Sequence, residues 1–162
     1  MIQAPVYTFR PATMDDIDLL AGWRAAPHVR EWWGADDPYG AAQLADPRVA
    51  RWIVSVGTHP FAYMQDYAVH GWDDHHFAHL PEGSRGIDQY IGDPALLGVG
   101  HGKRFIAARV RTLFVGGAPV VATDPHPENA RAIAVYRKVG FAVSGPPEET
   151  AWGPILPMLA RR

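Results

Sequence analysis

One glycine-rich segment constrains the fold of this chain most, because it joins an apolar stretch to a helical pattern. It reads Leu97-Gly98-Val99-Gly100-His101-Gly102-Lys103. Alternating glycines let backbone N–H groups approach a phosphate closely, and the start of a helix adds partial positive charge. The segment therefore indicates an anion-binding turn between a strand and a helix. A strand-to-helix loop that needs glycine only for its backbone conformation is the alternative. The spacing is neither the dinucleotide-binding fingerprint nor the P-loop, so a nucleotide phosphate is not the expected ligand.

The composition is typical of one globular domain. The chain has 162 residues, of which 48% are hydrophobic, so we expect a single domain over residues 1–162. A formal net charge of −2 argues against nucleic acid as a partner. The absence of cysteine excludes disulfides, thiol nucleophiles and cysteine-based metal sites.

The sequence also predicts the location of the protein. Residues 1–5 lack a basic region followed by an apolar run, and no stretch approaches the ~18 apolar residues of a membrane span. We therefore expect a cytoplasmic protein that does not enter a membrane. Nothing in the sequence indicates an oligomeric state.

Hydrophobic periodicity predicts alternating strands and helices. Strands are expected over 6–10, 51–56, 60–69, 87–91, 119–123, 141–144 and 155–160. A capping-box pattern of Thr13 and Asp16 begins the first helix, and a short helix is expected over 41–45 within a loop of residues 34–48. A longer helix follows the glycine-rich segment and ends at Gly116-Gly117. The last helix has Pro127 near its first turn and Gly140 after its end. This order predicts an α/β (α+β) protein with a mixed, mostly antiparallel sheet.

Motifs in the second half of the chain resemble those of a known enzyme superfamily. The Gly-x-Gly turn is followed by Asn129-x-x-Ala132 and then by Tyr136-x-x-x-Gly140-Phe141. This order resembles the acetyl-CoA site of the GNAT acetyltransferases. The runs 28–34 and 85–91, with Gln65-Asp66-Tyr67 between them, are similar to the aminoglycoside 6'-N-acetyltransferases. The resemblance implies a GNAT-like fold and direct acetyl transfer from acetyl-CoA, as cosubstrate, to a small-molecule amine.

The resemblance implies which residues hold the cofactor. The backbone of Gln89, Tyr90 and Ile91 would lie beside the pantetheine arm and polarise the thioester carbonyl. Asn129 would contact the cofactor from a neighbouring helix. The pyrophosphate would lie on the turn formed by Gly98, Val99, Gly100, His101, Gly102 and Lys103.

Asp88 is the candidate general base. It interrupts an apolar strand segment just before the glycine-rich turn, and desolvation there would raise its pKa above the usual ~3.9. The alternative is a strand-end aspartate that hydrogen-bonds the next turn. The family-like Arg85-Gly86-Ile87-Asp88-Gln89 string favours the catalytic role.

Tyr136 is the candidate general acid, at the position that resembles the proton donor of the family. Transfer from a phenol of pKa ~10 to a thiolate whose acid has a pKa near 8.5 is uphill by roughly 2 kcal/mol, which a positioned hydrogen bond offsets. The alternative is an aromatic core residue on the same helix face as Ala132 and Val139.

A cationic acceptor needs carboxylates and polar walls. Asp124 matches an acidic position of the family, and Asp73 or Asp74 matches another in the long loop of residues 70–84. Trp32, Trp33, Gln65 and Tyr67 would form walls for a sugar ring or a cation. A tryptophan pair in the core and an aspartate pair in an exposed turn are equally simple interpretations.

The long loop also carries His70, His75, His76 and His79. Their spacing matches no zinc pattern, so we expect no metal. Two alternatives to an aminoglycoside enzyme stay open. One is an acyltransferase acting on a lysine or hydroxylysine amine in siderophore biosynthesis, and the other is a non-catalytic acyl-CoA-binding protein.

Overall fold

A computed structural model describes residues 3–35 and 39–162 of the chain. Part of the loop expected over 34–48, residues 36–38, lies outside these ranges. In the described part, the helices are α1 (Ile17–Ala25), α2 (Pro27–Trp33), α3 (Ala41–Ala45), α4 (His101–Val115) and α5 (Ala130–Val139). The strands are β1 (Tyr7–Pro11), β2 (Val49–Val56), β3 (His59–Ala68), β4 (Arg85–Ile91), β5 (Val120–Thr123), β6 (Ala142–Val143), β7 (Glu148–Thr150), β8 (Gly153–Ile155) and β9 (Met158–Arg161).

Seven strands form one sheet in the order β1-β2-β3-β4-β5-β9-β6, and β7 pairs with β8 separately. The strands β1 and β2 are antiparallel, as are β5 with β9 and β6 with β9, whereas β4 and β5 are parallel. The prediction of a mixed, mostly antiparallel sheet is therefore confirmed.

The chain divides into two compact units, which we describe separately. Unit 1 comprises residues 1–65 and 89–101, and unit 2 comprises residues 66–88 and 102–162. Both β3 and β4 begin in one unit and end in the other.

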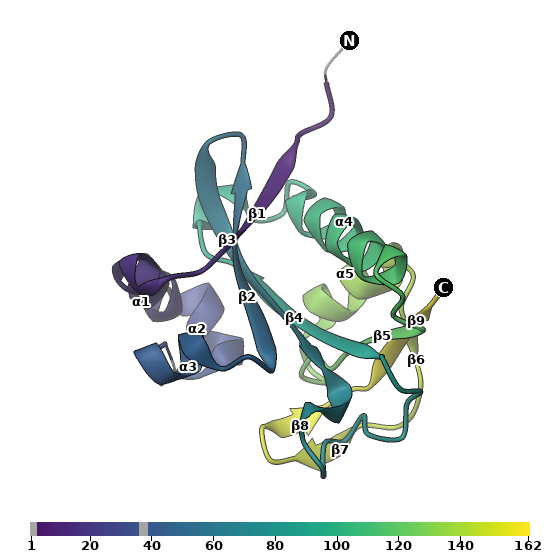
Figure 1. Cartoon of the computed structure of the whole chain (residues 1–162). Helices are drawn as coiled ribbons and strands as arrows, with labels where there is room; N and C mark the ends of the chain where they lie inside the picture. The colour runs from purple at the N-terminus through teal and green to yellow at the C-terminus, as the bar shows by residue number, and fades with distance from the viewer. Residues whose placement is uncertain (1–2, 36–38) are drawn as a thin grey trace. The chain divides into compact units, whose positions relative to one another are not determined.

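The core of unit 1 forms where α1 and α2 pack against strand residues. Leu20, Trp23 and Val29 from the helices contact Ile53 of β2 and Tyr63 of β3 in one buried cluster. Figure 1 shows α1, α2 and α3 grouped together beside β2. The predicted capping box is confirmed, because Asp16 accepts a hydrogen bond of 2.8 Å from the backbone N–H of Thr13.

The helix α2 was not expected from the sequence. It begins with Pro27, whose fixed φ suits the first helical position, and it ends at Gly34, which adopts φ 75°. Seven residues are too few to show a clear apolar period. The proline at the start and the glycine at the end were therefore the sequence signals from which this helix could be predicted.

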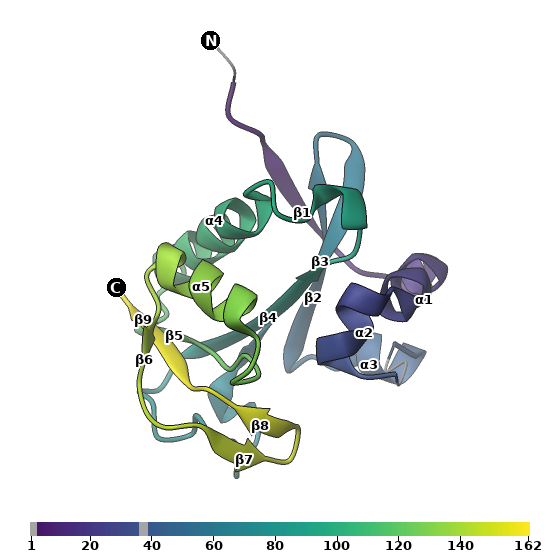
Figure 2. The same ribbon diagram turned by 180° about the vertical axis from the view of Figure 1, so that it is seen from behind.

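Unit 2 contains α4 and α5, which lie side by side in the two opposite views of Figures 1 and 2. The helix α4 ends before Gly116-Gly117, as expected. The helix α5 begins later than expected. Asn129 caps it by accepting a 3.1 Å hydrogen bond from the N–H of Ala132, so Pro127 lies in the preceding turn. Gly140 ends α5 in the left-handed conformation at φ 114°, which confirms its predicted role.

The end of the chain differs most from expectation. The strand predicted over 155–160 is divided, because Ile155 belongs to β8 and Met158 begins β9. Pro157 lies between them, and its missing N–H breaks the strand. The β7–β8 hairpin was not predicted. Its turn depends on Gly153 at φ 101°, and the many prolines nearby obscured the strand pattern.

Candidate functional site

The glycine-rich segment forms an exposed turn in front of α4. Gly98 and Gly100 adopt φ 73° and 89°, which residues with a side chain rarely do, so both positions require glycine. Residues 98–100 are exposed and α4 begins at His101. Gly102 and Lys103 belong to the first turn of that helix. A backbone of this kind presents N–H groups to solvent at the positive end of a 15-residue helix.

His101 is held in place by aromatic residues of unit 1. Its Nδ1 lies 2.7 Å from the hydroxyl of Tyr7, and the rings of Tyr7 and Phe61 lie 5.8 Å and 5.3 Å from the imidazole centroid. If the tyrosine hydroxyl donates, the hydrogen on the ring lies on Nε2, which is then a donor at the start of α4.

The segment Gln89–Ile91 combines a packed side chain with a polar backbone. Tyr90 is 8% exposed, and its hydroxyl lies 3.2 Å from that of Tyr39. Burial raises the pKa of Tyr90 far above its ordinary value, so its hydroxyl stays protonated. The carbonyl of Ile91 lies 2.8 Å from Nε2 of His28. In unit 1, the backbone of this segment is therefore anchored by its side chains and by α2.

The tryptophan pair separates into two environments. Trp33 packs edge-on against Tyr90 and Tyr63, with ring centroids 5.0 Å and 6.1 Å apart. Trp32 is 36% exposed. Gln65 accepts a 2.8 Å hydrogen bond from the hydroxyl of Tyr63. Trp33 thus contributes to the core of unit 1, and Trp32 is the tryptophan of the pair that is accessible to a ligand.

In unit 2, the candidate base, acid and substrate carboxylate all act on Tyr67. Burial raises the pKa of Tyr67 well above its ordinary value, and electrostatic interactions with Asp88, Asp124 and Tyr136 raise it further. The ring of Tyr67 lies against Gly86, which is opposite Ala122 in the parallel pair of β4 and β5, and Asp88 and Asp124 follow these two residues by two positions. Asp88 is half-buried in β4, Asp124 follows β5, and Tyr136 is a buried residue of α5. Three residues far apart in the sequence therefore act on one side chain.

A buried carboxylate next to Tyr67 fixes this part of β3. Asp66 is 1% exposed and is held by two arginines. Arg85 donates to Oδ1 at 2.6 Å, and Arg109 donates to Oδ2 through two nitrogens at 2.7 and 2.9 Å. The pair of guanidinium groups compensates for the loss of water around the carboxylate. The sequence contained a signal for these ion pairs, because an aspartate inside an apolar strand needs a buried partner.

Asp124 has a partner that the sequence did not indicate. Nε2 of His76 lies 2.7 Å from Oδ2 of Asp124, and the two side chains are 9% and 15% exposed. His75 stacks on His76 with ring centroids 4.2 Å apart. Burial lowers the pKa of His75 to about 4, and the neighbouring His76 contributes to the shift. The spacing of the histidines predicted only an exposed polar loop, which describes His70 and His79 but not this pair.

The other predicted residues lie in open positions. Asp73 and Asp74 are exposed, and the charge of Asp74 reaches His75. Asn129 uses its side-chain oxygen as the cap of α5, which leaves its amide group as the donor for a ligand. Within residues 3–35 and 39–162, no three histidine, aspartate or glutamate side chains come together in a way that could hold a metal ion.

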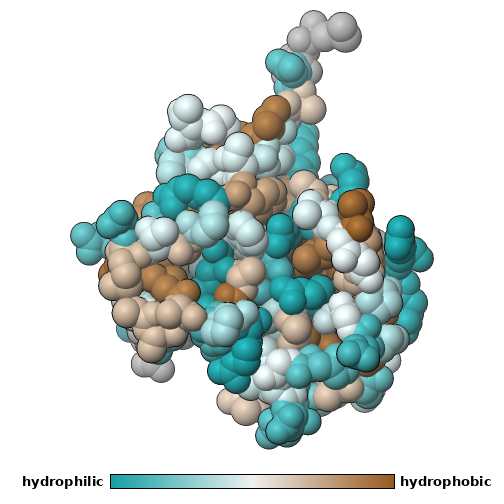
Figure 3. All heavy atoms as spheres, viewed as in Figure 1, coloured by the Kyte–Doolittle hydropathy of each residue, from teal (hydrophilic) through white to brown (hydrophobic). Residues whose placement is uncertain are grey.

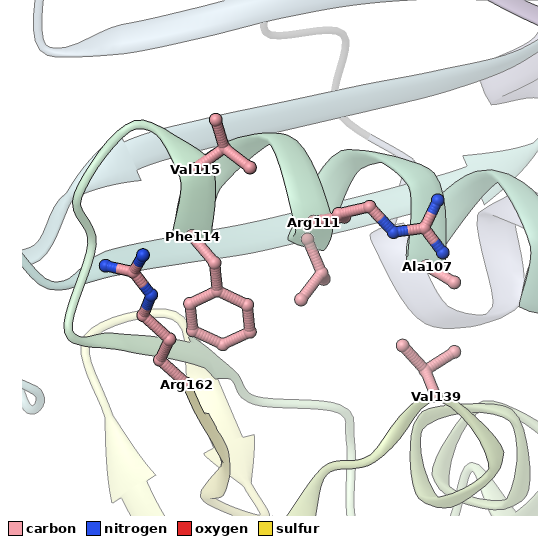
Figure 4. Close-up of a pocket in the computed structure, with 7 residues that line it drawn as sticks. Ala107, Arg111, Phe114, Val115, Val139 and Arg162 are labelled. Carbon is pink, nitrogen blue, oxygen red and sulfur yellow. The ribbon is translucent and has the colours of Figure 1, made fainter.

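An open pocket of about 320 Å³ lies between α4 and α5. In Figure 4, Phe114 from α4 and Val139 from α5 point toward the space between the helices, with Arg162 beside Phe114. Figure 3 shows hydrophobic atoms at the surface over the end of α4, where Val115 is 79% exposed. None of the predicted site residues lines this pocket.

Over the described ranges, no helix is long and apolar enough to cross a membrane.

Comparison with known proteins identifies one family over most of the chain. The family model of the GNAT acetyltransferase domain matches residues 12–147. The aminoglycoside N(6')-acetyltransferase type 1 of Klebsiella pneumoniae is 33% identical over 150 residues, which cover 85% of this chain and 75% of that protein.

Solved structures agree with this match. The aminoglycoside acetyltransferase AAC(6')-Ib in complex with coenzyme A superposes with a TM-score of 0.87 at 33% identity, over 97% of this chain and 95% of that one. Its complex with coenzyme A and kanamycin gives a TM-score of 0.87 at 32% identity, with the same coverage of both chains. The fold, the glycine-rich turn and the extent of these matches lead to one conclusion: the chain belongs to the GNAT family of acetyltransferases.

Proposed function

We propose that this protein transfers the acetyl group of acetyl-CoA to a primary amine of an aminoglycoside-like, polycationic acceptor. The observation that carries the proposal is that Asp88 and Asp124 follow Gly86 and Ala122, an opposed pair of β4 and β5, next to the buried Tyr67, on which Tyr136 also acts. Acetyl transfer to a cationic amine needs a base, an acid and a carboxylate that attracts the cation. The names of the similar proteins, which act on aminoglycosides, indicate the acceptor class.

For the cofactor, we assign the pyrophosphate to the exposed turn of residues 98–103. Its two glycines in the positive-φ region favour N–H groups that point outward, and the start of α4 favours a negative charge. We assign the pantetheine arm to the backbone of residues 89–91, which Tyr90 and His28 anchor. Asn129 contributes its side-chain amide.

For the chemical step, we assign the base to Asp88 and the acid to Tyr136. Asp88 is half-buried, so a proton that it accepts is shielded from exchange with bulk water. Tyr136 is 5% exposed and packs edge-on against Phe141 at 5.5 Å, which fixes the direction of its hydroxyl. A fixed donor lowers the barrier to protonation of the leaving thiolate.

For the acceptor, we assign Asp124 together with Asp73 and Asp74 to the ammonium groups. Tyr67 is the wall residue that we assign to the acceptor in unit 2. In unit 1, we assign the exposed Trp32 and the polar side chain of Gln65 to contacts with the acceptor. Several carboxylates attract a polycation more strongly than a singly charged amine, and salt weakens that preference. Because acetyl-CoA is supplied inside cells, we also propose that the protein acts in the cytoplasm.

The test is an acceptor screen that uses acetyl-CoA consumption and product mass as readouts. Kanamycin, spermidine, lysine and N6-hydroxylysine are compared at low and high ionic strength. We expect kanamycin to give the highest kcat/KM, and we expect its advantage over lysine to shrink as salt rises. Efficient acetylation of a lysine-type amine without any acetylated kanamycin would replace this function with that of the siderophore branch.

A further inference from the structure

The pair formed by His76 and Asp124 has a defined polarity. A carboxylate oxygen can only accept, so the 2.7 Å contact requires the hydrogen to lie on Nε2 of His76. In the neutral ring, the lone pair is then on Nδ1. An acidic partner that orients an imidazole in this way prepares its other nitrogen to accept a proton.

The other nitrogen of this ring lacks a donor. Nδ1 of His76 is buried, and no group in residues 3–35 or 39–162 hydrogen-bonds to it. A buried acceptor without a donor carries a free-energy cost, so this atom is available to a donor from a ligand or from water. Trp152 lies edge-on to the ring at a centroid distance of 5.8 Å and is itself 66% exposed. The buried rings of His75 and Phe77 also contact the imidazole, at centroid distances of 4.2 Å and 4.5 Å.

The side chains that face His76 are the rings of His75, Phe77 and Trp152 and the carboxylate of Asp124. The stacked His75 has its pKa lowered to about 4, and its Nδ1 accepts a 3.1 Å hydrogen bond from the N–H of Phe77. Asp74 acts on His75, and Tyr67 lies 5.4 Å from the ring of His75. Asp124 is the carboxylate in contact with His76, and it stabilises a positive charge there.

The acceptor nitrogen gives up two protons in the net reaction, one of which ends on the thiol and the other in solvent. An amine that binds as an ammonium therefore needs a base that takes the first proton before the attack. An alkylammonium loses one proton before its nitrogen can attack the thioester and another after the C–N bond forms. Asp88 accounts for one of these protons, and Tyr136 returns a proton to the thiolate. Asp124 and Asp88 each follow, by two positions, an opposed pair of residues in β5 and β4, so the His76–Asp124 pair lies at the same end of these strands as Asp88.

We infer that His76 is a catalytic residue that accepts the first proton of the acceptor ammonium, an assignment that rests on the proposed function. The N–H bond of the ammonium breaks, an N–H bond forms at Nδ1, and the positive charge moves to the imidazolium beside Asp124. The freed amine attacks the thioester carbonyl, Asp88 takes the second proton, and the thiolate leaves with the proton of Tyr136. The proton on Asp88 then returns to the Tyr136 phenolate, and His76 releases its proton to water, so one proton is released per turnover.

The test compares His76→Gln with the wild type. The glutamine amide keeps an N–H donor for Asp124 but has no basic nitrogen, so proton transfer is lost and the contact is retained. We expect kcat for kanamycin at pH 7 to fall by about 10²-fold, while the KM of kanamycin and the Kd of acetyl-CoA change by less than about 3-fold. His70→Gln, an exposed change in the same segment, is the control and keeps wild-type kinetics.

Two further readouts separate proton transfer from a structural role. Raising the pH from 7 toward ~9 increases the unprotonated fraction of a primary amine while a phenol of pKa ~10 keeps its proton, so it restores the rate of His76→Gln relative to the wild type, as does added imidazole. If His76→Gln fails to fold, His76→Asn is used in the same way. A wild-type kcat in the variant, or a loss that neither imidazole nor pH restores, overturns the role of His76. A wild-type protein that binds acetyl-CoA but acetylates no amine overturns the proposed function as well.

Discussion

The ring of Tyr67 lies against Gly86 so closely that no side chain fits between them. A Cβ atom on Gly86 would overlap the Cζ, Cε2 and Oη atoms of Tyr67. Gly86 lies in β4 and pairs with Ala122 of β5, and the ring of Tyr67 is 5% exposed. Glycine at this position therefore sets where Tyr67 lies, beside Asp88, Asp124 and Tyr136.

Replacing Gly86 with alanine displaces that ring. We expect Gly86→Ala to lower the free energy of unfolding by about 1–3 kcal/mol, the usual cost of overpacking, and to reduce kcat/KM for kanamycin at least ~10-fold. Thermal unfolding and initial rates measure the two effects. Gly22→Ala is the control, because a Cβ there has no atom within 4 Å and alanine favours a helix. Equal kcat/KM values for Gly86→Ala and the wild type would show that catalysis does not depend on the position of the Tyr67 ring.

Replacing Gly100 with valine tests the cofactor turn. Gly100 has φ 89°, which strains any other residue, and a side chain would also cover the N–H groups. We expect calorimetric titration to show at least a ~30-fold weaker affinity for acetyl-CoA. Gly117→Val, at φ 98° after the other end of α4, introduces a comparable strain away from the turn and keeps the affinity. If both variants bind acetyl-CoA equally, the turn is not the anion site.

The sequence predicted the elements whose signals are local. The capping box of Thr13 and Asp16 and the left-handed Gly140 each follow from the conformational preferences of particular residue types, and both are confirmed. Gly98 and Gly100 adopt positive φ, as a glycine-rich turn requires, and the binding of an anion there stays a prediction. The hairpin of β7 and β8 could not be predicted in this way, because its pairing depends on a turn hidden among prolines.

The features of the site that the sequence did not predict depend on contacts between residues far apart in the chain. Asp124 was predicted as a carboxylate for the substrate, but its contact with His76 joins residues 48 positions apart and leaves no trace in spacing. Likewise, the two arginines that hold Asp66 come from β4 and α4. The roles of the individual site residues, and the folding of residues 1–162 as one domain, stay predictions.

The Tyr136 hydroxyl is tested by removing it alone. Tyr136→Phe keeps the ring that packs against Phe141, so the melting temperature should not change. We expect the single-turnover rate of acetyl transfer to fall by roughly 10- to 100-fold, because the thiolate must leave without its proton donor. Rapid mixing with excess enzyme measures that step directly. Unchanged single-turnover rates would leave Tyr136 as a packing residue only.

The buried His75 makes stability depend on pH. Its pKa falls from 6.5 to about 4 on folding, so the unfolded chain binds a proton that the folded chain does not. Stability is therefore complete above pH 6.5 and decreases as pH falls toward 4, by at most about 3 kcal/mol from this residue. We expect His75→Gln to lose less stability than the wild type over this range in urea titrations. Identical pH profiles would show that His75 charges freely in the folded protein.

The central claim is that this chain acetylates an aminoglycoside amine with Asp88 as the base. The most direct measurement is the initial rate of acetylated kanamycin formation by the wild type and by Asp88→Asn, with the modified nitrogen located by NMR. We predict one new acetamide on kanamycin, a fall in kcat of about 10²-fold or more in Asp88→Asn, and an unchanged affinity for acetyl-CoA. No acetylated kanamycin from the wild type, or equal kcat values for the two proteins, would contradict the claim.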